Sequence, residues 1–495
     1  MSHDLTTLAS GLAGAEVHGN GAVEVQSLAH DSRHVSPGAL FVAIRGLKAD
    51  GNQFIDAALK KGAVAVASEE PPRPDVPWLK VPSARIALAS LAARLLDHPA
   101  QKLELVGVTG TNGKTTTTYL IDAALRAAGH SVGFLGTVQY RLGQQLMEAV
   151  RTTPESSDLQ GLFAEMVKAS CRYAVLEVSS HALALERVYG CDFRCAVFTN
   201  LTRDHLDFHG DMDAYFVAKR ILFETNLRRD GVAVINADDD RAAEMAASAR
   251  GRVWTFGLSH PADFHAEETD LRLSGTRLRV RTPRGLLDVA SPLLGRFNVE
   301  NLLAALAAAF ALDLPTAAVL SGLAGLGGVP GRMERIDLGQ SFSVIVDYAH
   351  TDDALKKLLE AVHSLGPRRV ITVFGCGGDR DHTKRPLMGA VAARLSDVVI
   401  VTSDNPRSEP PEAIIEEIQR GMNGGRKSER EVVVERRPAI RRALELAGPG
   451  DAVVIAGKGH ETGQVLRDRT IPFDDREVVR ELLGGEPPLA AGEGA

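Results

Sequence analysis

Cysteine is scarce in this sequence, and long apolar runs are missing. Four cysteines in 495 residues are too few for a disulfide framework, so we expect reduced thiols with a structural role. The amino-terminal residues lack a basic stretch followed by an apolar run, and no uninterrupted apolar segment is long enough to span a membrane. These absences predict a cytoplasmic protein that does not enter a membrane.

Blocks of basic residues are absent as well. The formal net charge is −7, and no cluster of lysine and arginine offsets it, so a nucleic-acid backbone would be repelled. Hydrophobic residues make up 44% and charged residues 24% of the chain, a balance typical of globular rather than disordered proteins. We therefore expect small-molecule partners and no nucleic acid.

The length and the pattern of the chain predict an α/β protein of about three domains. Short β-like runs fill the first part, and strands then alternate with amphipathic helices, as in a mostly parallel sheet. Residues 276–281 alternate polar and apolar side chains, which indicates an antiparallel insertion. In the last part, strands are expected at residues 344–347, 370–374, 398–402, 432–435 and 453–456, as in a Rossmann-like doubly wound domain.

The predicted domains differ in pattern. We expect a small α/β domain, a central domain with a mostly parallel sheet and a doubly wound C-terminal domain. Their predicted ranges are residues 1–98, 99–330 and 331–495. A cluster of glycine and proline ahead of Gly331 and Arg332 suits a hinge at the second boundary.

The strongest motif is a phosphate-binding loop at residues 106–116, which read VGVTGTNGKTT. A strand, a glycine-containing loop and a helix follow one another, so backbone N–H groups at the helix start can bind phosphate oxygens. Lys114 would neutralise phosphate charge, and Thr115 could hold Mg²⁺. The usual loop has glycine in place of Val108, so this is a shortened variant. A mere tight turn would leave the lysine and threonine unexplained. The predicted ATP-binding residues of the loop are Gly110, Thr111, Asn112, Gly113, Lys114, Thr115 and Thr116.

This loop resembles the ATP-binding loop of the Mur ligase family, whose members join an amino acid to a UDP-muramoyl peptide. Further motifs of the family follow in order in all three predicted domains. The resemblance implies a UDP-sugar-binding domain at residues 1–98, a central ATP-binding domain at residues 99–330 and an amino-acid-binding domain at residues 331–495. The resemblance implies an ADP-forming ligase that adds meso-diaminopimelate to the D-glutamyl carboxylate of UDP-N-acetylmuramoyl-L-alanyl-D-glutamate. An acyl phosphate would be the intermediate, and the product would be the tripeptide precursor of peptidoglycan.

The resemblance also implies a magnesium site, with two ions. Glu177 follows a hydrophobic strand, and His205 lies in the segment NLTRDHLD at residues 200–207. Both resemble the family's magnesium ligands, as does Thr115. Taken alone, His205 would more often be a hydrogen-bonded structural histidine.

Lys219 has two readings. Its place on an amphipathic helix is typical of a solvated lysine. The resemblance implies instead that its amine carries a carboxyl group from CO₂, forming N6-carboxylysine, a carbamate that helps to hold the second Mg²⁺. A lysine in a confined site can lose its proton and react as a nucleophile. The catalytic residues implied are Lys114, Lys219 and His205.

More ATP-side residues are implied by the resemblance. Asn301 opens an Ala-rich helix, and Asp347 begins the segment DYAH. Asn and Asp also favour helix caps, which is the alternative reading. Asp352 stands where the family commonly has proline, so the geometry of that loop is open. The additional ATP-binding residues implied are Asn301, Arg332 and Asp347.

Loops of the first two domains resemble the family's binding elements for the UDP-sugar and its dipeptide. Arginine suits a carboxylate or phosphate because its fork can donate two parallel hydrogen bonds. As bare turns these loops would be unremarkable. The residues implied are Leu28, Ser32, Thr152, Thr153, Ser179 and Arg187.

The tetrapeptide DNPR at residues 404–407 resembles the mark of the diaminopimelate-adding members. Pro406 would fix a turn that aims Arg407 into the cleft beyond the strand ends. Diaminopimelate differs from lysine by a second carboxylate, which a bidentate arginine can bind. Solvated side chains are the alternative for the outlying residues. The residues implied are Arg380, Asp404, Asn405, Pro406, Arg407, Gly457 and Glu461.

Three alternatives stay open. A lysine-adding member of the family would bind an amino acid without the second carboxylate, so Arg407 would lack its partner. A ligase like folylpolyglutamate synthase would share the ATP loop but lack the uridine-binding type of first domain. A nucleotide-driven binding switch would bind ATP without amine-dependent phosphate release. For the ligase we expect ATP, the UDP-muramoyl dipeptide and meso-diaminopimelate as partners, and a monomeric protein.

Overall fold

The computed structural model describes residues 3–46, 49–424 and 428–484. The chain divides into two compact units. The first comprises Met1–Ala266, Val280–Leu286 and Glu300–Leu323, and the second comprises Glu267–Arg279, Leu287–Val299 and Ala324–Ala495. The predicted boundaries at residues 98 and 330 stay predictions. The end of the predicted third domain, residues 485–495, lies outside the described residues.

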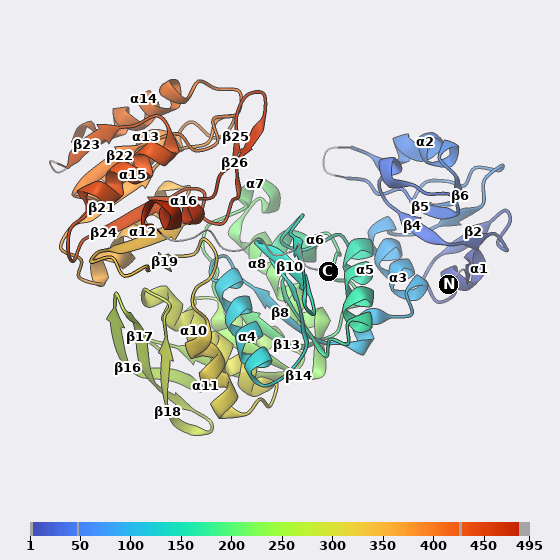
Figure 1. The fold of residues 1–495 in the computed structure, drawn as a ribbon. Helices are drawn as coiled ribbons and strands as arrows, with labels where there is room; N and C mark the ends of the chain where they lie inside the picture. Colours follow the sequence, from blue (N-terminus) through green and yellow to red (C-terminus); the bar gives the residue numbers. More distant parts are fainter. Residues whose placement is uncertain (1–2, 47–48, 425–427, 485–495) are drawn as a thin grey trace, which may run out of the picture. The chain divides into compact units, whose positions relative to one another are not determined.

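A five-stranded sheet forms the amino-terminal part of the first unit (Figure 1, blue). Its order is β2 (Glu16–His18), β7 (Trp78–Lys80), β6 (Ala63–Ser68), β5 (Ala39–Val42) and β4 (Ser27–Ala29), parallel except for β2. Leu40 and Val42 join one core cluster and Phe41 the other, because successive side chains of a strand face opposite sides. The helices are α1 (Leu5–Ala9), α2 (Ile55–Lys60) and α3 (Ala84–Leu95).

An eleven-stranded mixed sheet follows. The order is β11 (Gln145–Glu148), β10 (Gln139–Leu142), β9 (Val132–Leu135), β12 (Tyr173–Glu177), β8 (Glu104–Thr109), β13 (Phe193–Phe198), β14 (Leu227–Asn236), β15 (Arg252–Gly257), β16 (Phe264–Arg272), β17 (Gly275–Thr282) and β18 (Gly285–Ser291). In this order, each neighbouring pair from β9 to β16 is parallel, whereas the pairs β11–β10 and β10–β9 are antiparallel. Because β12, β8 and β13 are parallel neighbours, the loops at their carboxyl ends meet.

Helices connect these strands. They are α4 (Lys114–Ala127), α5 (Ser156–Lys168), α6 (Ser180–Ala184), α7 (Leu206–His209), α8 (Met212–Ile221), α9 (Ala242–Ser248), α10 (Arg296–Ala311) and α11 (Thr316–Gly325). The Ala-rich helix expected at residues 299–312 is therefore present as α10.

The second unit contains a six-stranded sheet (Figure 1, orange and red). Its order is β19 (Glu334–Ile336), β20 (Ser343–Asp347), β24 (Ala452–Ala456), β21 (Val370–Phe374), β22 (Val398–Val401) and β23 (Glu429–Val432), parallel except for β19. One face packs on α12 (Asp352–Ser364), α13 (Lys384–Leu395) and α14 (Pro411–Gly421), and the other on α15 (Arg436–Leu446) and α16 (Asp475–Leu482). A hairpin of β25 (Gly463–Val465) and β26 (Thr470–Pro472) follows β24. The sheet is doubly wound, as expected.

The strand expected at residues 432–435 is wrong in its bounds, because β23 occupies Glu429–Val432. Its pairing with β22 starts at Glu429, opposite Val398. The strand lies at the edge of the sheet and exposes Glu429 and Arg430, so an apolar run does not mark its start.

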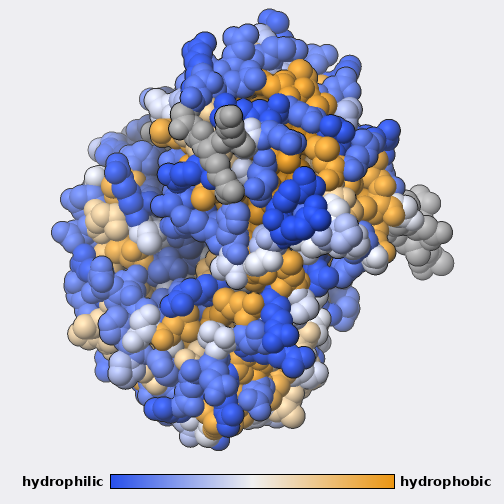
Figure 2. Space-filling view, turned by 90° about the vertical axis from the view of Figure 1, so that its left-hand side faces the viewer, coloured by the Kyte–Doolittle hydropathy of each residue, from blue (hydrophilic) through white to orange (hydrophobic). Residues whose placement is uncertain are grey.

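The surface and the cysteines are consistent with the composition. Within the described ranges, no helix is both long and apolar enough to cross a bilayer. Figure 2 shows apolar patches interrupted by hydrophilic residues. All four cysteines are free and buried.

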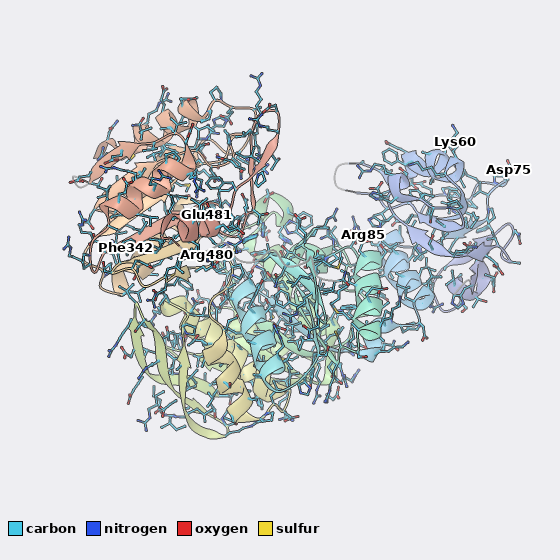
Figure 3. All side chains as sticks on the ribbon, in the orientation of Figure 1. Lys60, Asp75, Arg85, Phe342, Arg480 and Glu481 are labelled. Atoms are coloured by element: carbon cyan, nitrogen blue, oxygen red, sulfur yellow. The ribbon has the colours of Figure 1, made fainter. Side chains whose placement is uncertain are left out.

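A fully buried ion pair fastens α16 to α15 in the second unit. Arg436 Nε and Nη2 each donate to the Asp475 carboxylate at 2.7 Å, and both side chains are 0% exposed. The neighbouring pair, Arg437 with Glu481, joins the same helices at the surface, where the side chains are 45% and 40% exposed. Figure 3 labels Glu481 and its neighbour Arg480 on α16.

The two pairs form a matched test of burial. Asp475→Asn should lower the free energy of unfolding by about 3–5 kcal/mol, because it leaves the Arg436 charge buried and unpaired. Glu481→Gln should lower it by no more than about 1 kcal/mol, because water screens the exposed pair. Urea unfolding measures both changes, and equal losses would contradict the assignment.

Candidate active site

The phosphate loop joins β8 to α4, as predicted. Gly110 and Gly113 have φ values of +145° and +84°, which disfavour other residues. A Cβ at Gly110 would clash with the Thr199 hydroxyl, and one at Gly113 would clash with the Asn301 amide. Both positions therefore require glycine for steric reasons as well as conformational ones.

The loop after β13 packs against the phosphate loop and is hydrogen-bonded to it. Asn200 accepts hydrogen bonds from Thr111 N at 2.8 Å and, through Oδ1, from Asn112 N at 2.9 Å. Thr199 Oγ1 donates to the Asn112 carbonyl at 2.6 Å. Two of the backbone N–H groups predicted to bind phosphate therefore have protein partners. The other N–H groups predicted to bind phosphate lie at the start of α4, which begins at Lys114.

Glu177 lies fully buried at the end of β12 and connects two loops. Its carboxylate accepts hydrogen bonds from Thr115 Oγ1 at 3.1 Å and from Thr137 N and Oγ1 at 2.8 and 3.1 Å. Thr137 Oγ1 is also 3.0 Å from Thr152 Oγ1. The predicted magnesium ligands Thr115 and Glu177 are therefore brought together, with a hydroxyl chain that leads to Thr152.

Two lysines share one backbone oxygen of the phosphate loop. Lys114 Nζ donates to the Gly110 carbonyl at 2.9 Å, and Lys219 Nζ donates to the same oxygen at 2.8 Å. Lys219 is 1% exposed, so the reading as a solvated helix lysine is wrong. Burial lowers the pKa of Lys219 well below its usual range, and the charge of Lys114 lowers it further. A neutral, nucleophilic amine is thus favoured at this position.

Three histidines gather beside these lysines. The ring centroid of His181 is 4.8 Å from that of His205 and 5.4 Å from that of His209. His205 has a left-handed backbone, with φ at +54°, and its Nε2 lies 3.4 Å from Asp204 Oδ2. His209 Nε2 is 3.0 Å from Ser180 Oγ. Burial, together with His181, lowers the pKa of His209 to about 4.

Residues predicted for the dipeptide lie next to Glu177. Thr153 is 1% exposed, its Oγ1 donates to the Glu177 carbonyl at 2.8 Å, and it accepts from Ser179 N at 3.1 Å. Arg187 Nη1 donates to the Thr153 carbonyl at 3.2 Å, and its Nε lies 3.3 Å from Glu155 Oε2. Arg187 therefore has a carboxylate partner within the protein. Leu28 and Ser32 are half-buried, in and just after β4.

Asn301 lies on α10 in the first unit and is buried, with Thr117 Oγ1 donating to its Oδ1 at 3.2 Å. Arg332 and Asp347 belong to the second unit. The Asp347 carboxylate accepts from Met333 N at 2.7 Å and Ala349 N at 2.8 Å, and burial raises its pKa. Arg332 lies over the Tyr348 ring, 5.2 Å from its centroid.

Asp352 is the first residue of α12, and Thr351 caps that helix. This first helical position accepts proline, and an acidic residue there is also favourable at the helix N-terminus. The departure from proline is therefore compatible with an ordinary helix start.

The tetrapeptide DNPR follows β22, as expected. Asp404 and Asn405 are buried, and Asn405 Nδ2 donates to Glu461 Oε2 at 2.8 Å. Arg407 has a φ of +51°, and its Nη1 donates to the Gly378 carbonyl at 2.8 Å. Burial raises the pKa of Asp404. Of the other predicted residues, Arg380 is exposed, and Gly457 has a φ of +119° close to the Asp404 carboxylate.

The sequence reasoning missed three residues that hold these groups. Thr137 binds Glu177, Lys458 binds Asn405 and Glu461, and Arg385 binds Glu409 and Glu417 beneath the loop that carries Arg380. Arg385 and Lys458 are 0% exposed. Lys458 lies between the predicted residues Gly457 and Glu461, but nothing in its spacing distinguishes it from a surface lysine.

A phosphate loop between a parallel strand and a helix, with two lysines on one of its carbonyls, defines an α/β enzyme that uses a nucleoside triphosphate. The comparisons with known families narrow this class. Residues 24–95 match the Mur ligase family catalytic domain, residues 108–309 the Mur ligase middle domain, and residues 331–459 the Mur ligase glutamate ligase domain. The chain belongs to the Mur ligase family.

Two relatives that share one name, that of a diaminopimelate ligase, match nearly the whole chain. The UDP-N-acetylmuramoyl-L-alanyl-D-glutamate--2,6-diaminopimelate ligase of Solibacter usitatus (strain Ellin6076) is 50% identical over 468 residues, covering 93% of this chain and 94% of the relative. That of Gloeobacter violaceus (strain ATCC 29082 / PCC 7421) is 50% identical over 465 residues, with the same coverage.

A solved structure of a ligase with this name is 35% identical, covers 98% of this chain and 99% of its own, and has a TM-score of 0.73. Folylpolyglutamate synthase of Mycobacterium tuberculosis, with ADP and AMPPCP, is 21% identical and has a TM-score of 0.63. It covers 81% of this chain and 96% of its own. At that identity the likeness concerns the fold alone.

The histidine cluster predicts a pH dependence of stability. The pKa of His209 is about 4 in the folded chain, whereas an unfolded histidine titrates near about 6.5. Between these values only the unfolded state gains the proton, so the free energy of unfolding should fall as the pH drops from about 6.5 to about 4. Urea unfolding curves measured across this pH range should show a smaller drop in the free energy of unfolding for His209→Gln than for wild type.

Ser180→Ala is the control, because it removes the hydroxyl beside Nε2 but keeps the imidazole. It should retain the wild-type slope. Parallel curves for His209→Gln and wild type would contradict the assignment.

Proposed function

We propose that this chain adds meso-diaminopimelate to the D-glutamyl carboxylate of UDP-N-acetylmuramoyl-L-alanyl-D-glutamate, with ATP cleaved to ADP and phosphate. One observation supports the ATP chemistry. Thr115, Glu177 and the lysines Lys114 and Lys219 lie together at the carboxyl ends of β8 and β12. The substrate assignment is supported by the names of relatives that match the chain nearly end to end.

The reaction must activate a carboxylate, because an oxide is too poor a leaving group for direct attack by an amine. The glutamyl carboxylate attacks the γ-phosphorus of ATP, the bond to the bridging oxygen breaks, and ADP leaves. The amine of diaminopimelate then attacks the acyl phosphate, loses a proton, and the tetrahedral intermediate expels inorganic phosphate. Lys114 at the start of α4 would offset the charge repulsion between the anions in the first step.

Magnesium fits this loop in its donor chemistry. The Thr115 hydroxyl and the Glu177 carboxylate are hard oxygen donors, which Mg²⁺ prefers. When bound, the ion would neutralise phosphate charge. No three His, Cys, Asp or Glu side chains are grouped as a metal site within the described part of the chain. The nucleotide would then supply further oxygens, with His205 and a carboxylated Lys219 as the proposed ligands for a second ion.

The environment of Lys219 supports the proposed carboxylation. The neutral Nζ attacks the carbon of CO₂, loses a proton, and becomes an anionic carbamate. The carbamate places an anion beside the Lys114 ammonium, so the charge that lowers the pKa of the amine would attract the modified group. The Tyr215 ring, whose centroid lies 4.3 Å from Nζ, limits the space around the group.

Recognition of the other substrates is proposed for residues of each unit. In the first unit, Leu28, Ser32, Thr152, Thr153, Ser179 and Arg187 would hold the UDP-sugar and its dipeptide. In the second, Asn405 Nδ2 donates to Glu461 Oε2 between the loops after β22 and β24, and Arg407 Nη1 donates to the Gly378 carbonyl. Arg407 would bind the far carboxylate of diaminopimelate, and Glu461 its ammonium, with Arg380, Asp404, Pro406 and Gly457 around them.

Carboxylation of Lys219 can be tested directly. With ¹³C-labelled bicarbonate, wild type should show a carbamate carbonyl signal by NMR that Lys219→Met lacks. Amine-dependent phosphate release by Lys219→Met should fall on the order of 100-fold, the usual loss for a group that stabilises transition-state charge. Lys168→Met, which alters an exposed lysine on α5, should retain both signal and rate. A signal that persists in Lys219→Met would refute the modification.

The amino-acid assignment is tested by supplying purified UDP-muramoyl dipeptide with meso-diaminopimelate, L-lysine or L-ornithine and measuring amide product and phosphate. Diaminopimelate should be preferred. Arg407→Ala should raise its KM roughly 10- to 100-fold, the size of one or two hydrogen bonds to a charged group, and leave the KM for ATP unchanged. Arg394→Ala, an exposed arginine on α13, is the control. Equal use of lysine by wild type would instead support the lysine-adding alternative.

A further inference from the structure

Lys458 lies just after β24, enclosed by oxygens of the second unit. Its side chain is 0% exposed. Nζ lies 2.6 Å from the Gly463 carbonyl, 3.0 Å from Glu461 Oε2 and 3.2 Å from Asn405 Oδ1. An ammonium has three N–H donors, so these three acceptors saturate it. Lys458 therefore has no donor left for a substrate.

The contact with Lys458 fixes the orientation of the Asn405 amide. Oδ1 of Asn405 accepts from Lys458 and also from Val465 N at 2.9 Å, while Nδ2 donates to Glu461 Oε2 at 2.8 Å. A flipped amide would direct its NH₂ group at an ammonium and a backbone N–H, and its oxygen at a carboxylate. The partners decide an amide orientation, so Lys458, together with Val465 and Glu461, determines which atoms Asn405 presents.

Lys458 also holds one oxygen of Glu461. Oε2 of Glu461 accepts from both Lys458 and Asn405, and the side chain is 34% exposed. Among the residues that the structure describes, Oε1 has no hydrogen-bond partner. The carboxylate is thus anchored at one oxygen and presents the other, as the ammonium of an amino acid would require.

The same network reaches Arg407. Val465, which donates to Asn405, accepts a hydrogen bond from Arg407 N at 3.1 Å. Strand β25 therefore contacts Lys458 through Gly463 and both Asn405 and Arg407 through Val465. One buried cation ties together the loop after β22, the loop after β24 and β25.

We propose that Lys458 is a positioning residue for the incoming amino acid, acting through Asn405 and Glu461 and touching no substrate itself. This inference rests on the proposed function, because those two residues are the proposed diaminopimelate contacts. It differs from a general role in stability, which would lower the melting temperature and leave the affinity for each substrate unchanged in the folded enzyme.

Steady-state kinetics of Lys458→Met in the full chain test the proposal. The KM for diaminopimelate should rise on the order of ten- to a hundredfold, as for other outer-shell partners of binding residues. The KM for ATP should stay at its wild-type value, and kcat at saturating diaminopimelate should change less than KM. Lys458→Gln, whose amide can still donate to the Gly463 carbonyl, carries the same prediction if the methionine variant does not accumulate as folded protein.

Arg369→Met is the matched control. It breaks a contact of 2.7 Å to the buried Asp451 at the amino ends of β21 and β24, the opposite end of the same sheet. It should lower the melting temperature and leave the KM for diaminopimelate unchanged. A rise in that KM equal to the rise in Lys458→Met would overturn the specific role of Lys458.

A double-variant cycle with Glu461→Gln identifies the route of the effect. If Lys458 acts through Glu461, adding Lys458→Met to Glu461→Gln should raise the KM far less than Lys458→Met does in wild type. If the two substitutions raise the KM for diaminopimelate by factors that simply multiply in the double variant, the proposal is overturned. An unchanged KM in Lys458→Met alone would also overturn it. The absence of any diaminopimelate-dependent product from wild type would instead overturn the proposed function.

Discussion

The carbonyl oxygen of Gly110 accepts hydrogen bonds from Lys114 and Lys219, and the ATP side of the molecule is arranged around that contact. Burial and the charge of Lys114 both lower the pKa of Lys219. Residue 110 must be glycine, since a side chain would collide with Thr199. The loop can therefore take the shape in which one carbonyl faces both lysines only with glycine at this position.

The sheet topology explains why these groups meet. Strands β12, β8 and β13 are parallel neighbours, so their carboxyl ends lie at one edge. Each contributes one component: Glu177 ends β12, the phosphate loop follows β8, and Asn200 lies in the loop after β13. Lys219 comes from α8 and reaches the loop across 109 positions of sequence.

In the second unit, several buried charged side chains are held by partners of opposite charge. Arg436 is paired with Asp475, and Arg385 with Glu409 and Glu417, where the Arg385 guanidinium holds the pKa of Glu409 down at about 2. Lys458 has acceptors for all three of its donors. Because an unpaired buried charge is costly, each network has one favourable geometry. The proposed binding residues Asn405 and Glu461 are held in place by their contacts with Lys458.

The sequence by itself determined the features that depend on neighbouring residues. The phosphate loop, the strand before DNPR and the Ala-rich helix follow from local pattern, since period, glycine and capping act over a few positions. The fold class followed from the same alternation. The edge strand β23 was misplaced, because its start carries exposed charges in place of an apolar run.

Only the tertiary structure decided the burial and the partners of several polar residues. Lys219 and Lys458 are indistinguishable from surface lysines in the sequence, and Thr137 from any threonine in a turn. Their roles arise from contacts with segments far along the chain. Desolvation depends on everything packed around a group, and no local pattern records it.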